Sequence, residues 1–264
     1  MCLAILGLAA LALVSAVIVT KRSNPAMPAV EPAAAPKPAA ALPAAPPPAF
    51  AIPRPLPLVG SADATRWAPL LRAVAVRSEP TEQAPVIETL GLKTPEGTSN
   101  LVPVLDRHQD RRGTLWLRVR APALPDNVEG WVPRAALGGY NLVHTRLVVD
   151  LEQLQATLFS RGERVYDAPI GVGKADSPTP RGEFYIRNEL RAYGSSFYGP
   201  IAFGTSARSR VLTDWPAGGF VGIHGTDRPD LLPGRVSHGC IRLRNADIVR
   251  LARLLPIGTP LTIQ

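Results

Sequence analysis

The residues best suited to chemistry lie near the C-terminus, in the run GIHGTDRPDLLPGRVSHGCIRLRNAD from Gly222 to Asp247. This run holds one thiol, Cys240, and two imidazoles, His224 and His238. A thiol of ordinary pKa is mostly protonated at neutral pH, so a neighbouring imidazole that accepts its proton makes it a fast nucleophile. The residue types therefore predict thiol-based nucleophilic catalysis, and their spacing leaves open which histidine is the base.

Two strands are expected to position these side chains. If residues 220–225 form one strand, His224 points away from the apolar face of that strand. If residues 237–243 form another, every second side chain shares one face, namely those of His238, Cys240 and Arg242. Two imidazoles, a thiol and a guanidinium then converge on one site.

The segment from Ser237 to Cys240 also contains a glycine, Gly239, which lets other backbone groups approach closely. Successive N–H groups there can be directed at one point, as in an oxyanion hole for acyl transfer. Zinc binding is the alternative chemistry for Cys and His. It would need a third or fourth ligand, and the nearby acidic and imidazole side chains show no ligand spacing, so we expect neither metal nor cofactor.

Three motifs resemble the catalytic domain of L,D-transpeptidases (the YkuD type). They are SHGC at Ser237–Cys240, HGT at His224–Thr226 and PTPRGEFYI at Pro178–Ile186. The resemblance implies a β-sandwich-like fold in which Cys240 is acylated by a peptidoglycan stem tetrapeptide, with release of its terminal D-alanine. The acyl group then passes to the side-chain amine of a second stem, which forms a 3-3 cross-link.

The same resemblance implies roles for individual residues. His224 is the general base, held by the backbone carbonyl of Gly225, and Ser237 helps to shape the oxyanion site. The oxyanion contacts come from His238, Gly239 and Cys240. Arg242 stands where family members carry Asn or Arg, and it is expected to clamp a substrate carboxylate. Covalent inhibition by carbapenems is expected as well.

The predicted fold is mainly β: a small SH3-like barrel over residues 65–138, then the β-sandwich-like catalytic domain over 139–264 with one C-terminal helix. Short alternating runs predict five strands in the first domain, at residues 72–77, 86–90, 101–105, 115–120 and 130–132. VRSEP at Val76–Pro80, LWLRV at Leu115–Val119 and GWVP at Gly130–Pro133 resemble bacterial SH3-like domains. That resemblance implies a peptide- or glycan-binding module, or a spacer.

Similar runs in the second domain predict further strands at residues 146–151, 155–160, 165–171 and 182–188. One helix is expected to begin with Asn245 as its N-cap and to end at Pro256. Its apolar face is predicted to carry Ile248, Leu251 and Leu255. The run from Arg191 to Pro200, rich in Gly and aromatic residues, is either a substrate-covering loop or an ordinary one.

The first 60 residues differ in composition from the rest. Residues 1–22 include an uncharged apolar run, Cys2–Thr20, which is predicted to be a signal-anchor or a signal peptide. Lys21 and Arg22 follow it, on the flank where the positive-inside bias disfavours export. Residues 23–60 are rich in Pro and Ala and predict an extended linker. We expect a membrane-tethered, extracytoplasmic protein of the cell envelope.

The formal net charge of the 264 residues is +8. Helix-turn-helix, zinc-finger and RNA-binding aromatic motifs are missing from the sequence, so we expect an anionic envelope polymer, not nucleic acid, as the partner. The other cysteine, Cys2, lies before the linker, so a disulfide within the folded domains is not expected. Two alternatives remain open: an L,D-carboxypeptidase that uses water as acceptor, and a non-catalytic cell-wall-binding protein.

Overall fold

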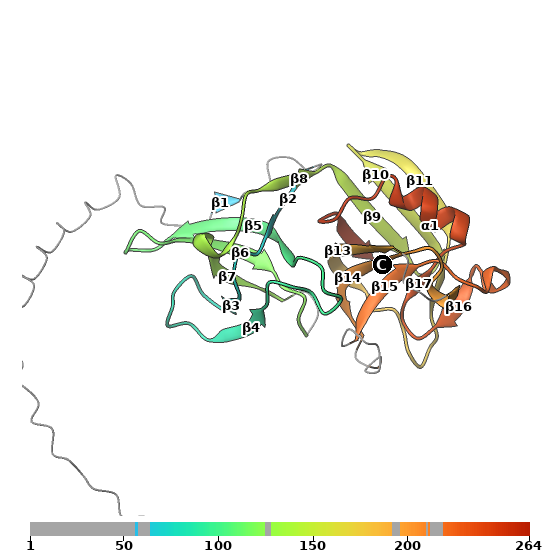
Figure 1. The fold of residues 1–264 in the computed structure, drawn as a ribbon, viewed down its shortest axis with the longest axis horizontal. Coiled ribbons are helices and arrows are strands. Elements are labelled where there is room, and N and C mark those ends of the chain that lie inside the picture. Colours follow the sequence, from blue (N-terminus) through green and yellow to red (C-terminus); the bar gives the residue numbers. More distant parts are fainter. Residues whose placement is uncertain (1–55, 58–63, 125–127, 192–195, 210, 212–218) are drawn as a thin grey trace, which may run out of the picture. The chain divides into compact units, whose positions relative to one another are not determined.

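The computed structural model describes residues 56–57, 64–124, 128–191, 196–209, 211 and 219–264. The predicted signal-anchor and most of the Pro/Ala-rich linker lie outside the described residues. The described part is mainly β, as the alternating runs predict, with a single α-helix in that part of the chain (Figure 1). Among these residues, no helix is both long and apolar enough to cross a membrane.

The first sheet, here called the N-terminal sheet, contains the five strands predicted from alternation and adds further strands at its margins. Its strands are β1 (Leu56–Pro57), β2 (Thr65–Pro69), β3 (Val74–Arg77), β4 (Val86–Leu90), β5 (Leu101–Gln109), β6 (Leu115–Arg120), β7 (Glu129–Pro133) and β8 (Asn141–Val143). They run in the order β4-β3-β7-β6-β5-β2-β8, with β1 paired to β5. The buried side chains are small and branched, including Val76, Val104, Leu117, Val119 and Val132.

The second sheet, here called the C-terminal sheet, carries the predicted catalytic motifs. Its strands are β9 (Thr145–Asp150), β10 (Gln155–Ser160), β11 (Glu163–Pro169), β12 (Gly171–Gly173), β13 (Gly182–Arg191), β14 (Ile201–Arg208), β15 (Phe220–His224), β16 (Gly234–Ser237), β17 (Ile241–Arg242) and β18 (Pro260–Ile263). They are ordered β11-β10-β9-β18-β13-β14-β15-β17-β12-β16. Residues on β14 and β15 are almost all buried, which explains why neither strand shows a clean alternation.

The predicted strand over residues 237–243 is wrong, because the chain turns before the nucleophile. β16 ends at Ser237, and β17 begins only at Ile241. Between them Gly239 has a φ of +120°, a conformation that favours glycine. The Ser237 hydroxyl accepts the N–H of Gly239 at 3.0 Å and donates to the carbonyl of Cys240 at 2.5 Å, which closes the turn. The predicted strand at 165–171 is likewise divided between β11 and β12.

The helix is found in the predicted segment, but it ends at Ala252, four residues before Pro256, and Asn245 is not its N-cap. Helix α1 (Asn245–Ala252) begins at Asn245, and its N-cap, Arg244, makes no side-chain capping bond. The Asn245 amide oxygen instead accepts the backbone N–H of Thr226 at 2.9 Å. The predicted apolar face is confirmed for Ile248 and Leu251, which are buried; Leu255 is buried too, but it lies beyond the end of the helix. Helix α1 lies beside β10 and β11 in Figure 1, and its Arg250 donates to the carbonyl of Asp167 on β11.

Candidate active site

Cys240 directly precedes β17, and the residue is only 5% exposed. Strand β17 runs parallel to β15, with Ile223 opposite Ile241 and His224 opposite Arg242. This register carries Gly222 to the position beside Cys240. The backbone N–H of Gly222 donates to the Cys240 Sγ at 3.4 Å. The sulfur is therefore held by a backbone donor from the neighbouring strand.

His224 ends β15 and is 1% exposed. Its side chain shares a face with Gly222, because the two residues are two positions apart on one strand. A methyl group built on Gly222 would lie 3.8 Å from Cδ2 of His224 and 3.9 Å from Sγ of Cys240. The imidazole and the thiol thus border the same small volume beside Gly222.

The ring orientation of His224 is set by its backbone neighbour. Its Nδ1 lies 2.6 Å from the carbonyl oxygen of Gly225, and the carbonyl can only accept, so Nδ1 carries the hydrogen. In the neutral ring the lone pair is then on Nε2. A histidine in this tautomer can take a proton at Nε2, as a general base must.

Burial favours the uncharged form of both groups. It raises the pKa of the Cys240 thiol to about 11, against the lowering effects of the Gly222 N–H and the Arg242 charge. It lowers the pKa of His224 to about 4, against the raising effect of the Gly225 carbonyl, while Arg242 lowers this pKa further. At neutral pH the site therefore holds a thiol beside a neutral imidazole, not a thiolate beside an imidazolium.

Arg242 faces the same site from β17. It is 8% exposed, and its guanidinium carbon lies 4.7 Å from the centroid of the Phe197 ring. Tyr198 meets His224 edge to face, with ring centroids 5.0 Å apart. Both aromatic residues belong to the run predicted as a possible lid, Arg191–Pro200, of which residues 192–195 lie outside the described residues. The described part of that run therefore covers the imidazole and the guanidinium.

The turn before Cys240 places the other predicted site residues, Ser237, His238 and Gly239, in different surroundings. The side chain of His238 is exposed, whereas His224 is buried beside Gly222, so the geometry favours His224 as the base. Ser237 is buried, and its hydroxyl oxygen accepts the N–H of Gly239. That N–H therefore points at the Ser237 side chain within the turn. The predicted oxyanion role of Gly239 would require that bond to open. The oxyanion roles of His238 and Cys240 stay predictions.

Three further residues position the site: Gly222 and Thr179, for which the sequence predicts no role, and Asn245, which it predicts only as a helix N-cap. Gly222 supplies the N–H on the sulfur, and Asn245 ties helix α1 to the loop after His224. Thr179 donates to the carbonyl of Gly239 at 2.8 Å and accepts the N–H of Gly173 at 2.9 Å. Thr179 and Asn245 both lie within the motifs quoted from the sequence, but their partners are distant along the chain, so only a contact map could reveal them.

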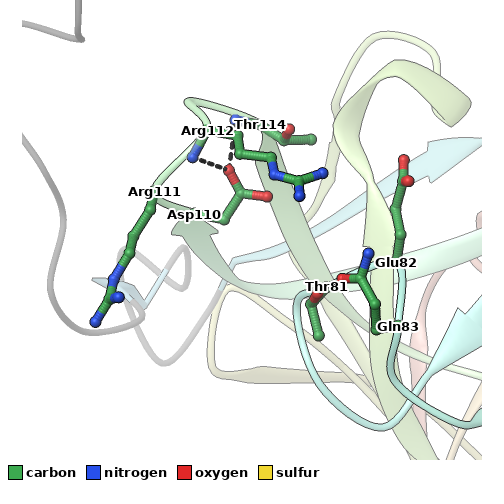
Figure 2. Close-up of a pocket in the computed structure, with 7 residues that line it drawn as sticks. All are labelled: Thr81, Glu82, Gln83, Asp110, Arg111, Arg112 and Thr114. Atoms are coloured by element: carbon green, nitrogen blue, oxygen red, sulfur yellow. Dashed lines mark hydrogen bonds between the residues drawn. The ribbon is translucent and has the colours of Figure 1, made fainter.

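A separate hollow of about 250 Å³ lies in the N-terminal sheet (Figure 2). It is lined by Thr81, Glu82, Gln83, Asp110, Arg111, Arg112 and Thr114. The carboxylate of Asp110 accepts the backbone N–H groups of Arg112 and Thr114, both at 2.9 Å, and these hydrogen bonds help to lower its pKa. The lining includes neither a thiol nor an imidazole, so this hollow has no part in the chemistry of Cys240.

Comparison with known proteins places the similarity on the C-terminal sheet. The chain is 37% identical over 120 residues to YkuD of Bacillus subtilis, whose name describes it as an L,D-transpeptidase; the match covers 46% of this chain and 65% of that protein. It is 31% identical over 118 residues to YqjB of the same organism, which covers 42% of this chain and 65% of that one. The match thus spans 65%, or just under two thirds, of the length of each of these curated relatives.

Among solved structures, an Enterococcus faecium L,D-transpeptidase is 27% identical, with a TM-score of 0.36, over 46% of this chain and 49% of that one. Bd1075 of Bdellovibrio bacteriovorus is 29% identical, with a TM-score of 0.37, over 46% and 47% of the two chains. Residues 144–263, which include Cys240, His224 and Arg242, match the family model of the YkuD L,D-transpeptidase catalytic domain.

Proposed function

We propose that this protein is an L,D-transpeptidase that forms 3-3 cross-links between peptidoglycan stem peptides through a Cys240 acyl-enzyme. The observation that carries the proposal is the placement of the Cys240 thiol and the His224 imidazole around Gly222, on one face of paired strands. The match of residues 144–263 to the YkuD catalytic domain supports the same reaction.

The first half-reaction transfers an acyl group from the donor stem to sulfur. Cys240 Sγ attacks the carbonyl carbon that precedes the terminal D-alanine, and His224 Nε2 takes the thiol proton. The S–C bond forms, the amide C–N bond breaks, and the imidazolium returns its proton to the leaving amine of D-alanine. In the second half-reaction the acceptor amine attacks the thioester, loses a proton to His224, and releases the sulfur, which regains a proton from the imidazolium.

The neutral resting forms of the two groups decide how this chemistry proceeds. A thiol with a pKa near 11 is not ionised in advance at neutral pH, so the proton must move to His224 as the sulfur attacks. A histidine with a pKa near 4 is already unprotonated at neutral pH and is ready to accept it. Arg242 stabilises the negative sulfur and, in the proposed complex, binds the substrate carboxylate.

Intact-mass spectrometry with imipenem tests the nucleophile. The full chain is expected to gain the mass of one imipenem, and peptide mapping is expected to place it on Cys240. Cys240→Ala should gain none, and His224→Ala should keep its fold but react at least about a hundredfold more slowly. An unmodified wild-type protein would instead favour the non-catalytic cell-wall-binding alternative.

Muropeptide analysis tests the acceptor. Purified sacculi incubated with the wild-type protein should yield 3-3 cross-linked dimers, whereas Cys240→Ala should yield none. Tripeptides without dimers would assign the protein as an L,D-carboxypeptidase. The two results differ only in whether an amine or water receives the acyl group, so they separate the reactions without changing the proposed nucleophile.

We also propose that the N-terminal sheet is an SH3-like module, and that the protein acts outside the cytoplasm, tethered by its apolar N-terminal segment. Strands β3 to β7, which carry the VRSEP, LWLRV and GWVP motifs, support the first part. The uncharged run Cys2–Thr20 and the Pro/Ala-rich stretch after it support the second. Membrane fractionation of cells that express the full chain, with and without residues 1–22, tests the tether.

A further inference from the structure

One turn of the N-terminal sheet, residues 93–99, contacts buried side chains on β13 of the C-terminal sheet. Lys93 and Ser99 form an isolated antiparallel bridge that closes this turn. Within it, the N–H of Gly97 donates to the carbonyl of Thr94, and Gly97 takes a φ of +83°, which favours glycine. The turn presents the side chain of Glu96, which is only 7% exposed.

Glu96 is the carboxylate partner of a buried arginine on β13. Nη2 of Arg187 lies 2.8 Å from the Glu96 carboxylate, and the Arg187 side chain is 1% exposed. The second carboxylate oxygen accepts the Asn188 side-chain amide at 3.1 Å. Asn188 also donates to the Thr98 hydroxyl in the same turn, at 3.0 Å. Burial lowers the pKa of Arg187, and the nearby carboxylate raises it. Glu96 therefore offsets the cost of keeping a charged guanidinium inside the protein.

A bulge in β13 explains why an arginine lies in the interior. In the pairing of β13 with β14, Ile186 lies opposite Thr205 and Asn188 opposite Gly204, so Arg187 is the extra residue. Bulges re-aim side chains and are frequent beside active sites. The Arg187 guanidinium lies 3.6 Å from the ring centroid of Phe220, the first residue of β15.

Short contacts connect this ion pair to the nucleophile. The Asn188 amide oxygen accepts the N–H of Gly204 at 2.9 Å, and Gly204 lies opposite Gly222 in the pairing of β14 with β15. The next contact is the N–H of Gly222 on the sulfur of Cys240. Glu96, Gly222 and His224 also line one narrow pocket. Arg187 therefore contacts the start of β15 at Phe220, and Asn188 binds Gly204, the residue on β14 that pairs with Gly222 at the centre of β15.

We propose that Glu96 is a positioning residue of the catalytic site: the N-terminal sheet supplies the carboxylate that holds Arg187 and Asn188, and through them the Gly222 N–H against the Cys240 sulfur. This inference rests on the proposed function only in taking Cys240 as the nucleophile. It gives the N-terminal sheet a part in catalysis in addition to any binding role. A catalytic half without this turn would retain its nucleophile but lose the support behind β15.

The test compares Glu96→Gln with Glu79→Gln, a matched change at an exposed glutamate of the same sheet. The first readout is the rate of Cys240 alkylation by iodoacetamide as a function of pH, followed by peptide mass spectrometry on the full chain. Loss of the Gly222 N–H removes a contact that favours the thiolate, so Glu96→Gln should move the alkylation profile to higher pH. Glu79→Gln should follow the wild-type profile. Coincident profiles for Glu96→Gln and the wild type would overturn the inference.

The second readout is acylation by imipenem, which should slow about tenfold to a hundredfold in Glu96→Gln. A double variant, Glu96→Gln with Arg187→Met, removes the unpaired buried charge and should regain thermal stability. If Glu96 positions the site, acylation of this double variant stays slow. If acylation recovers together with thermal stability, Glu96 has a structural role only. A wild-type protein that resists imipenem would contradict the proposed function, while the alkylation profiles would still decide the role of Glu96.

Discussion

Mild acid should destabilise the folded chain through one buried imidazole, that of His224. Burial lowers its pKa from 6.5 to about 4 in the folded state, whereas the unfolded chain keeps the ordinary value. Between these two values the unfolded chain binds more protons than the folded one, so the free energy of unfolding falls as the pH falls. Above about pH 6.5 this contribution is fully present.

The magnitude follows from the two pKa values. A difference between 6.5 and about 4 corresponds to roughly 3 kcal/mol in total, of which about 2 kcal/mol is lost by about pH 5. Carboxylates elsewhere in the protein also titrate in this range. Their contribution is the same in variants that differ only at one histidine, so it cancels when the variants are compared.

The assay is urea unfolding followed by far-ultraviolet circular dichroism, at about pH 7 and about pH 5, for the wild type, His224→Asn and His238→Asn. The asparagine amide at position 224 can still donate to the Gly225 carbonyl. The wild type and His238→Asn, whose substituted side chain is exposed, should each lose about 2 kcal/mol more than His224→Asn between the two conditions. An equal loss in all three proteins would refute the assignment of a buried, neutral His224.

The buried thiol should also show its high pKa directly: Cys240 alkylation by iodoacetamide should keep rising with pH through the neutral range, and a plateau below about pH 8 would instead indicate a preformed thiolate–imidazolium pair. Thr179→Val should lower the free energy of unfolding by about 1–3 kcal/mol, because the Gly239 carbonyl loses its buried donor, while Thr179→Ser should retain most of it in the same urea assay. Gly204→Ala should cost about 1–3 kcal/mol, since the new methyl group would collide with the Asn188 amide; unchanged urea midpoints would show that the Asn188 side chain can move aside.

Much of the fold was open to prediction because strand alternation is a local property. The run LWLRVR and the runs at 86–90 and 155–160 appear as β6, β4 and β10. Strands β14 and β15 are buried along most of their length, so β14 went unpredicted and β15 was found through its motif. Asn245 is a residue type that often serves as an N-cap. Its side chain instead accepts a hydrogen bond from the backbone N–H of Thr226, a residue 19 positions away in the sequence. The helix propensities of neighbouring residues carry no information about such a tertiary hydrogen bond.

The residue types and their spacing already indicate which chemistry is available: one short stretch holds a thiol, two imidazoles and a guanidinium, in motifs similar to those of L,D-transpeptidases. The folded chain favours His224 over His238 as the base, because the turn at Gly239 leaves His238 exposed and the parallel register of β15 and β17 brings His224 to the site. The pKa shifts of Cys240 and His224 also depend on the fold, because they arise mainly from burial, which is a property of the whole structure around a group. The proposed role of Glu96 depends on the fold as well, because its partner Arg187 lies 91 residues further along the chain.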